Sequence, residues 1–222
     1  MNTPTPTPAP RSRAELIASL SEEITPVRRV KPSQGYALIA LGSVVAAVIS
    51  VVLHRLWMGI FAGEASSYFW IINGLLLVLG IASTAGLVAG SLPRVGARGN
   101  APAWSAAMLA VVPVAALLGI ATAAPGDTHA TSGLMFWKCA LYALCAGLLV
   151  AGSAIAVLRR GAPVSLERSG WLTGLAAGSL GSIAYGITCP LDSLAHVGII
   201  HVLPVPIAAV IGRFVVPPLI RW

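Results

Sequence analysis

The sequence predicts an all-α integral membrane protein, a bundle of six transmembrane helices preceded by a short amphipathic N-terminal helix. Three observations support this fold class: the composition, the length of the apolar stretches and the placement of the basic residues. Of the 222 residues, 57% are hydrophobic and only 9% are charged, whereas a soluble domain carries about 25% charged residues. The mean hydropathy is +0.87. We therefore expect the chain to lie in a lipid bilayer.

Six apolar stretches are long enough to cross a bilayer, because about 20 helical residues span its hydrocarbon core. The stretches are expected at about 36–53, 69–91, 103–124, 134–158, 170–188 and 196–219. The first begins too late and lacks the small-residue cleavage pattern of a signal peptide. The short connections leave no room for a second folded domain. We therefore expect a cytoplasmic N-terminal segment at 1–35 and a six-helix transmembrane domain at 36–222.

The basic residues predict the orientation, since cytoplasmic loops carry an excess of Lys and Arg. Twelve of the 14 Lys and Arg residues precede the first stretch, lie between stretches two and three or four and five, or lie near the C-terminus. Only Arg55 and Lys138 lie on the opposite side. Both termini are thus predicted to face the cytoplasm. Topology also accounts for the net charge of +7, so we expect no direct contact with nucleic acid.

The N-terminal segment contains a predicted helix with one apolar face. Ser12 and Glu15 form the Ser-x-x-Glu pattern of a capping box, and Pro26 ends the helix. A helix of about three turns is not stable alone in water. We therefore expect it to bind a partner protein; the alternative is a plain linker helix. The residues expected to contact the partner are Glu15, Leu16, Ile17, Leu20, Glu23 and Ile24.

The predicted spans offer little for transport or catalysis. Ionisable residues inside membrane helices usually mark transport or proton relay, and here only His201 and Arg213 lie between the span ends. The chain has no Gly-x-Ser-x-Gly, no phosphate-binding loop and no Cys-x-x-Cys. We therefore expect a protein that is not an enzyme and needs no cofactor. A membrane thiol-redox protein and, less favoured, a small transporter stay open as alternatives.

The run GITCPLDSLAHVGIIH at 186–201 places polar and thiol groups in apolar surroundings. Cys139 lies about one turn inside the outer end of the fourth stretch and Cys189 closes the fifth. Cys139, Cys189, Asp192 and His196 are therefore expected to converge at the outer face. Asp192 and His196 share a helical face if the sixth stretch starts early. Such groups suit a soft or borderline metal such as zinc. A Cys139–Cys189 disulfide is an alternative in an oxidising compartment, and apolar packing of free thiols is a third.

Two neighbouring residues are less closely tied to this cluster. Cys145 follows Cys139 by six residues and is rotated by about 240° at 100° per residue, so we expect it to face elsewhere as an apolar packer. His201 lies in the outer half of the sixth stretch. It is expected either as an accessory to the cluster or as a neutral imidazole bonded to a neighbouring carbonyl.

Three blocks of the sequence resemble the NrsF family, the negative regulators of sigma F. They are LIASLSEEITPVRRVKPS near the start, CALYALCAGLLVAGSAIAVLRRGAPV in the middle, and TCPLDS with IHVLPVPIAAVIGRFVVPPLIRW at the end. The most specific elements are Arg-Arg-Gly-Ala-Pro at 159–163, Cys-Pro-x-Asp at 189–192 and Arg-Trp at 221–222. The resemblance extends over nearly the whole chain from about residue 14.

The resemblance implies a six-helix anti-sigma factor of the bacterial inner membrane. Its cytoplasmic N-terminal segment would hold an extracytoplasmic-function (ECF) sigma factor away from RNA polymerase. Two outer cysteines, which map onto Cys139 and Cys189, would sense stress through a transient heavy-metal ion or through oxidation. His201 falls where the family tends to have a histidine. A signal at the cysteines would draw the outer ends of the fourth and fifth spans together and release the sigma factor.

Overall fold

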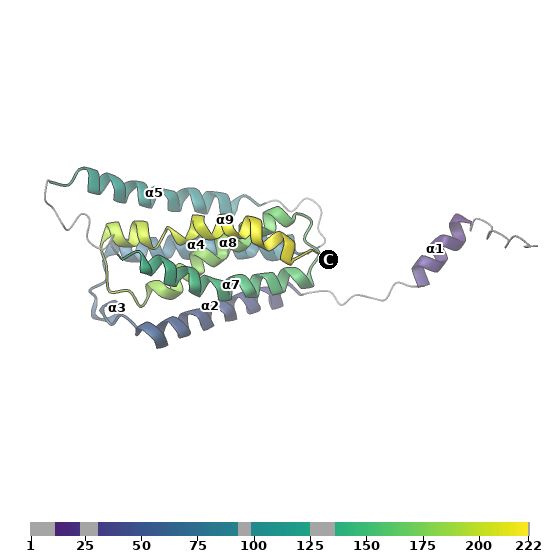
Figure 1. Cartoon of the computed structure of the whole chain (residues 1–222), viewed down its shortest axis with the longest axis horizontal. Helices are drawn as coiled ribbons and strands as arrows, with labels where there is room; N and C mark the ends of the chain where they lie inside the picture. Colours follow the sequence, from purple (N-terminus) through teal and green to yellow (C-terminus); the bar gives the residue numbers. More distant parts are fainter. Residues whose placement is uncertain (1–11, 23–30, 93–98, 125–135, 222) are drawn as a thin grey trace, which may run out of the picture.

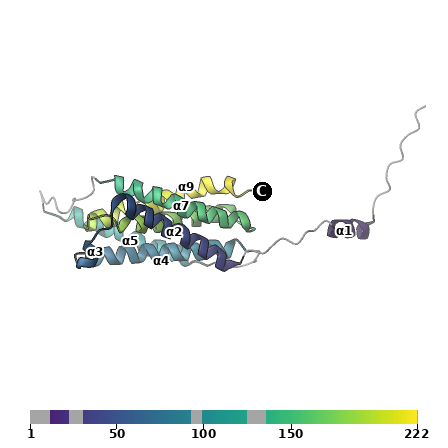
Figure 2. The ribbon, with the colours of Figure 1, turned by 90° about the horizontal axis from the view of Figure 1, so that it is seen from below.

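The computed structural model describes residues 12–22, 31–92, 99–124 and 136–221. All regular elements within these ranges are helical, which confirms the predicted all-α class. They are α1 (Arg13–Glu22), α2 (Pro32–His54), α3 (Gly59–Ala62), α4 (Ser67–Gly90), α5 (Ala101–Ala121), α7 (Lys138–Arg160), α8 (Leu166–Gly186), the π-helix η1 (His196–Ile200) and α9 (Pro204–Leu219). The long helices run side by side, and α1 lies apart from them (Figures 1 and 2).

The bundle has two ends that differ in which helices begin and end there. The cysteine end is where α4 and α7 begin and α8 ends, and α3 lies there too (Figure 1). The opposite end is where α2 begins and α9 ends (Figure 1). Because α1 precedes α2 in the chain, it joins the bundle at the opposite end.

Five helical segments are long and apolar enough to cross a membrane: α2, α4, α5, α7 and the run His196–Leu219 formed by η1 and α9. Their bounds agree with five of the six expected stretches to within a few residues. The remaining stretch forms α8, which has 21 residues but is not among these five because Gly and Ser replace larger apolar residues. Four helices (α2, α4, α7 and α9) pack against α8, and fourteen of its residues are buried. It therefore forms the centre of the bundle.

The central helix approaches α9 so closely that no side chain fits between the two backbones. Gly170, Gly174 and Gly178 recur every four residues and share one face of α8. A Cβ atom at Gly170 would lie 2.5 Å from the carbonyl oxygen of Gly212, and one at Gly178 would lie 2.7 Å from the Cα of Val205. Small residues allow such contacts between membrane helices, where packing replaces the hydrophobic effect as the source of association.

The contact between α8 and α7 is equally close. A Cβ atom at Gly181 would lie 2.5 Å from the carbonyl oxygen of Ala143 and 2.6 Å from the backbone nitrogen of Gly147. Conversely, a Cβ atom at Gly147 would lie 2.7 Å from the carbonyl oxygen of Ala177. Since the atoms in these contacts belong to the backbone, neither helix can give way by changing a rotamer.

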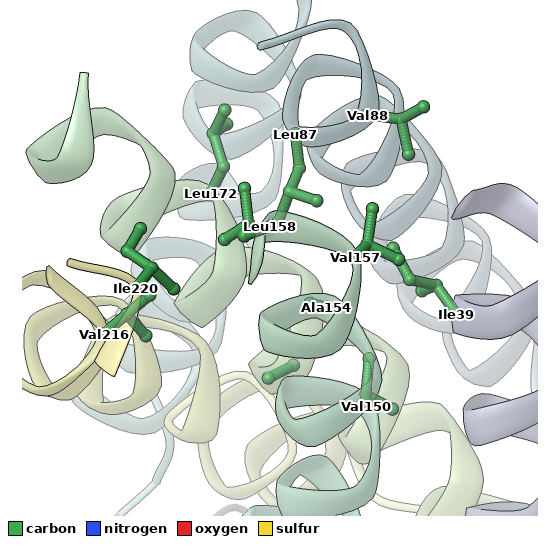
Figure 3. Packing of buried hydrophobic residues seen from close by; sticks show 11 residues of the cluster. Ile39, Leu87, Val88, Val150, Ala154, Val157, Leu158, Leu172, Val216 and Ile220 are labelled. Carbon is green, nitrogen blue, oxygen red and sulfur yellow. The ribbon is translucent and has the colours of Figure 1, made fainter. Parts of the chain in front are cut away.

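A cluster of buried apolar side chains joins five helices toward the opposite end (Figure 3). Ile39 comes from α2, Leu87 and Val88 come from α4, and Leu172 comes from α8. The α7 residues Val150, Ala154, Val157 and Leu158 lie between them, together with Val216 of α9 and the following Ile220. This core holds the end of the bundle to which the N-terminal segment is attached.

The sixth expected stretch is not one continuous α-helix. The π-helix η1 ends at Ile200, residues 201–203 form turns, and α9 begins at Pro204. Proline suits the first position of a helix because its missing N–H would have had no partner there. The outer part of this stretch therefore becomes a separate short element, and the second part restarts at Pro204.

The Gly181 contact leads to a stability prediction. Gly181→Ala should destabilise the folded protein by about 1–3 kcal/mol, the usual cost of overpacking, because the new methyl group meets backbone atoms. The matched control is Gly152→Ala on α7, where a Cβ atom meets nothing within 4 Å. That change should be neutral or stabilising by up to about 1 kcal/mol. Unfolding of the purified protein in detergent, followed by circular dichroism, measures both; equal effects would contradict the close packing.

Candidate functional site

The two cysteines that the sequence placed at the outer face meet at the cysteine end of the bundle. Cys139 lies in the first turn of α7, and Cys189 follows the end of α8 by three residues. Their sulfur atoms are 3.9 Å apart. Both thiols are free and buried. The two residues are 50 positions apart in the chain, so the contact depends on the packing of α7 against α8.

A histidine and a tyrosine complete the cluster around the two sulfur atoms. The Nε2 atom of His196, at the start of η1, lies 3.3 Å from the Cys189 sulfur, and the residue is fully buried. The two sulfur atoms and the ligand nitrogen of His196 all lie within 4.8 Å of one another. The Tyr185 hydroxyl donates to the Cys139 sulfur at 3.5 Å. Two thiols and one imidazole are therefore close enough together to bind one metal ion.

The close α7–α8 contact positions these residues. Gly181 and Ala143 touch one helical turn away from Tyr185 and Cys139 respectively. The segment after α8 is also bonded to the loop after α2, because the Trp57 backbone N–H donates a hydrogen bond to the carbonyl of Ile187 at 3.1 Å. Cys189 thus follows a segment whose backbone is held on two sides.

Electrostatics favour a protonated Cys189 in this arrangement. The contact with the Cys139 sulfur and the burial of the side chain both raise the pKa of Cys189 above that of an ordinary thiol. A negative charge on one sulfur opposes a second charge on the other, since the two lie in contact in a site with little solvent.

Asp192 lies outside this cluster and holds the start of α4 instead. Its carboxylate accepts hydrogen bonds from the backbone N–H of Ser66 at 2.6 Å and from the Ser66 hydroxyl at 2.8 Å. Ser66 is the N-cap of α4 and accepts from the Phe69 N–H. The Tyr68 hydroxyl donates to the Asp192 carbonyl at 3.0 Å. Asp192 and His196 are expected to share a helical face only if the sixth stretch starts early, and this condition is not met, because the helical turn begins at residue 194.

His201 and Cys145 differ in their relation to the cluster. The His201 ring lies edge-on to His196, with centroids 5.0 Å apart, and stacks on Tyr185 at 6.1 Å. His201 is buried, and its Nε2 has no hydrogen-bond partner among the described residues. Cys145 is exposed on α7, which confirms that it faces elsewhere.

Three residues near the cysteines were not anticipated from the sequence: Tyr185, Ser66 and His54. His54 ends α2 and packs against Tyr142 at 4.6 Å and against Tyr185 at 5.3 Å between ring centroids. Tyr185 could have been found, since it precedes Cys189 by one helical turn. Ser66 precedes an apolar run, the usual place of an N-cap, but nothing in the sequence pairs it with Asp192.

The N-terminal helix presents a second candidate site. Its capping box is confirmed: the Ser12 N–H donates to the Glu15 carboxylate at 2.9 Å, and the Glu15 N–H donates to the Ser12 hydroxyl at 3.2 Å. Leu16 and Ile17 are 47% and 58% exposed. The expected contact residues Glu23 and Ile24, and the side chain of Leu20, lie outside the described part of the structure.

The contact between Asp192 and Ser66 leads to a second prediction. Asp192→Asn should destabilise the protein by about 1–3 kcal/mol, the cost of losing a hydrogen bond to a charged group. Ser66→Ala should cost about 1 kcal/mol or more as a lost N-cap. In the double variant the two losses should not add, because the residues share one interaction. Glu64→Gln, a change at an exposed acid in the same loop, serves as the control in the unfolding measurement; full additivity would contradict the contact.

Comparison with known proteins agrees with the resemblance noted from the sequence. Residues 20–222 match the family described as NrsF, negative regulator of sigma F. A protein of Azospira oryzae (strain ATCC BAA-33 / DSM 13638 / PS), named "Probable anti-sigma-F factor NrsF", is 26% identical over 215 residues, which cover 94% of this chain and 98% of that relative. No solved structure matches the chain. The chain therefore belongs to the NrsF family of anti-sigma factors, the negative regulators of sigma F.

Proposed function

We propose that this anti-sigma factor holds an ECF sigma factor through its N-terminal segment and releases it when Cys139 and Cys189 sense chemical stress. The observation that carries the proposal is the contact of the two thiols at 3.9 Å. They lie at one end of the bundle, while the N-terminal segment with its exposed apolar helix joins the other end. The proposed sensor therefore lies at one end of the bundle, and the proposed partner-binding helix is connected to the other end.

The proposed setting is the bacterial inner membrane, with α8 as the sixth span and both termini in the cytoplasm. A low mean hydropathy of α8 is compatible with a membrane span, because α8 packs against four other helices and has little contact with lipid. Exposed aromatic residues support a membrane interface near each end of the bundle, where such residues are enriched. They are Phe61, Trp70, Phe136 and Trp137 at the cysteine end and Tyr36, Trp104 and Trp171 at the opposite end.

The proposed sigma-binding surface is the apolar face of α1. Leu16 and Ile17 lie on that face and remain largely exposed. A short helix gains stability when its apolar face enters a groove on a partner. The sigma factor would supply that groove, and its position at the membrane would keep it from RNA polymerase.

The proposed signal passes from the cysteines to the helices through the segment that follows α8. Oxidation by a two-electron acceptor would remove two protons and two electrons from the thiols and bring their sulfur atoms to about 2.05 Å, from 3.9 Å. Capture of a metal ion would instead fix the sulfur atoms near their present separation. Either event constrains Cys189, and Asp192, three residues later, is bonded to the N-cap of α4. To switch sigma binding almost fully, the signal must shift the equilibrium by about 5 kcal/mol.

The test of sigma binding is purification of the detergent-solubilised protein from its native host, followed by mass spectrometry. An ECF sigma factor should accompany the full chain from unstressed cells and should be absent when residues 1–33 are deleted. Leu16→Glu with Ile17→Glu should also abolish capture, because two charges would enter the apolar interface. Ala18→Glu, on the opposite face of α1, is the matched control and should retain the sigma factor. Absence of any sigma factor from the intact protein would refute this function and turn attention to thiol-redox assays.

The test of sensing uses the three cysteines. With Cys139→Ser or Cys189→Ser, a reporter of the sigma factor should stay at its uninduced level in cells exposed to a cadmium salt or to hydrogen peroxide. The Cys145→Ser protein should respond as the unmodified protein does, because Cys145 is exposed and does not face the buried Cys139–Cys189 pair. Normal induction in both pair variants would sink the sensing role, whereas a response to one agent alone would identify the chemistry.

A further inference from the structure

We propose that Cys139, Cys189 and His196 form a three-ligand site for a borderline divalent cation of the Zn²⁺ type. The idea deepens the sensing role proposed above and takes its biological meaning from that role. The structure places the imidazole of His196 beside the thiols and bonds Asp192 to Ser66 instead, which leaves a set of two sulfur ligands and one nitrogen ligand.

The spacing of the ligand atoms suits one shared ion. Two thiolates bound at about 2.3 Å to a tetrahedral zinc ion lie about 3.8 Å apart, and a thiolate and an imidazole nitrogen lie about 3.6 Å apart. The corresponding distances here are 3.9 Å between the sulfur atoms and 3.3 Å between the Cys189 sulfur and His196 Nε2. All three atoms lie within 4.8 Å of one another. A cation could therefore bind with small side-chain movements.

Burial and charge also favour a cation at this point. The three ligand residues are buried, and a buried charge is stable only when it is paired or coordinated. When a divalent ion binds, each thiol releases its proton to solvent and donates a sulfur electron pair. Two thiolates, one neutral imidazole and one divalent cation then form a site without net charge.

The ligand set selects the class of ion. Thiolate and imidazole together suit zinc and its neighbours, whereas magnesium and calcium require oxygen ligands. The carboxylate nearest in sequence is engaged elsewhere, because Asp192 bonds to Ser66. Three protein ligands leave a fourth position for a small exchangeable group. Exchange at that position is what a sensor needs and a permanent structural site lacks.

The local backbone supports a functional role for His196. It begins the π-helix η1, in which the His201 N–H reaches back to the His196 carbonyl at 3.4 Å. Isolated π-helical turns are rare and are often found at functional sites. Residues 189–193 before it form no helix, so His196 lies at the junction of a loop and a π-helical turn.

The test is a titration of the reduced, full-length protein in detergent with Co²⁺, whose thiolate charge-transfer and ligand-field bands report the ligands. One Co²⁺ should bind per chain with the charge-transfer intensity of two thiolates. Cys139→Ser and Cys189→Ser should each remove about half of that intensity or abolish binding, and Cys145→Ser should change nothing. Zn²⁺ should displace the Co²⁺, and Mg²⁺ should not.

The variants at His196 separate this site from a simple thiol pair. His196→Asn should lower the affinity for Co²⁺ by more than the roughly 10–100-fold that loss of an outer-shell partner costs. His196→Cys restores a third ligand, so it should recover binding and add the charge-transfer intensity of one more thiolate. Glu64→Gln, a change at an exposed carboxylate on the same end of the bundle, is the control. Circular dichroism checks that each variant is folded.

The outcomes are distinct from those of the function proposed above, because the titration involves no sigma factor. Failure of the unmodified protein to bind Co²⁺, or unchanged affinity and spectrum in the His196→Asn protein, would overturn the three-ligand site. If the cysteine variants still abolish induction in cells, the sensing role would survive that failure, with oxidation as its chemistry. If Co²⁺ binds as expected but no sigma factor is captured, the site stands and the anti-sigma role falls.

Discussion

The backbone contact between α7 and α8 at Gly181 and Ala143 is the constraint on which the rest of the structure depends. No Cβ atom fits at Gly181, where the carbonyl oxygen of Ala143 lies 2.5 Å from the place it would occupy. One turn further along each helix, this closeness brings the Tyr185 hydroxyl within 3.5 Å of the Cys139 sulfur. A larger residue at Gly181 would separate the helices and with them the two thiols. The glycine that stabilises the bundle therefore also sets the geometry of the candidate sensor.

The short segment from Cys189 to His196 performs several tasks at once. It carries two of the three candidate ligands, and between them Asp192 bonds to the N-cap of α4. Proline at position 190 stiffens the start of the segment. Only a few residues separate the ligands from the bond to Ser66. A displacement of Cys189 would therefore move Asp192 as well, because the intervening chain is too short to absorb the movement. The segment thus links Cys189 to the N-cap of α4, Ser66, which lies 126 residues before Asp192 in the chain.

Much of the fold could be predicted from the sequence, and some of the site could not. Apolar stretches of spanning length located the long helices, and Ser12 with Glu15 located the start of α1. Convergence of Cys139 and Cys189 was predicted, since α7 and α8 are consecutive long helices and the start of one meets the end of the other. Metal binding, a disulfide and apolar packing stayed open as the use of the two thiols. The bond between Asp192 and Ser66 could not be predicted, because it joins distant loops through tertiary packing. The π-helix at His196 could not be predicted either, because hydrophobic periodicity does not distinguish a single π-helical turn from an α-helix.

Under the proposed sensing role, the central position of α8 would carry a small change at the cysteine end to the opposite end. Glycines place its backbone directly against α7 and α9, and it also packs against α2 and α4. Packed cores of this kind do not deform continuously, so a small displacement favours one discrete arrangement over another. In a bilayer the helices gain little from the hydrophobic effect and associate through packing, which makes the balance between two packings sensitive to a single new bond. Under the proposed sensing role, a cation or a disulfide at the cysteine end would need only to stabilise one packing of α8 in order to change the end where the N-terminal segment begins.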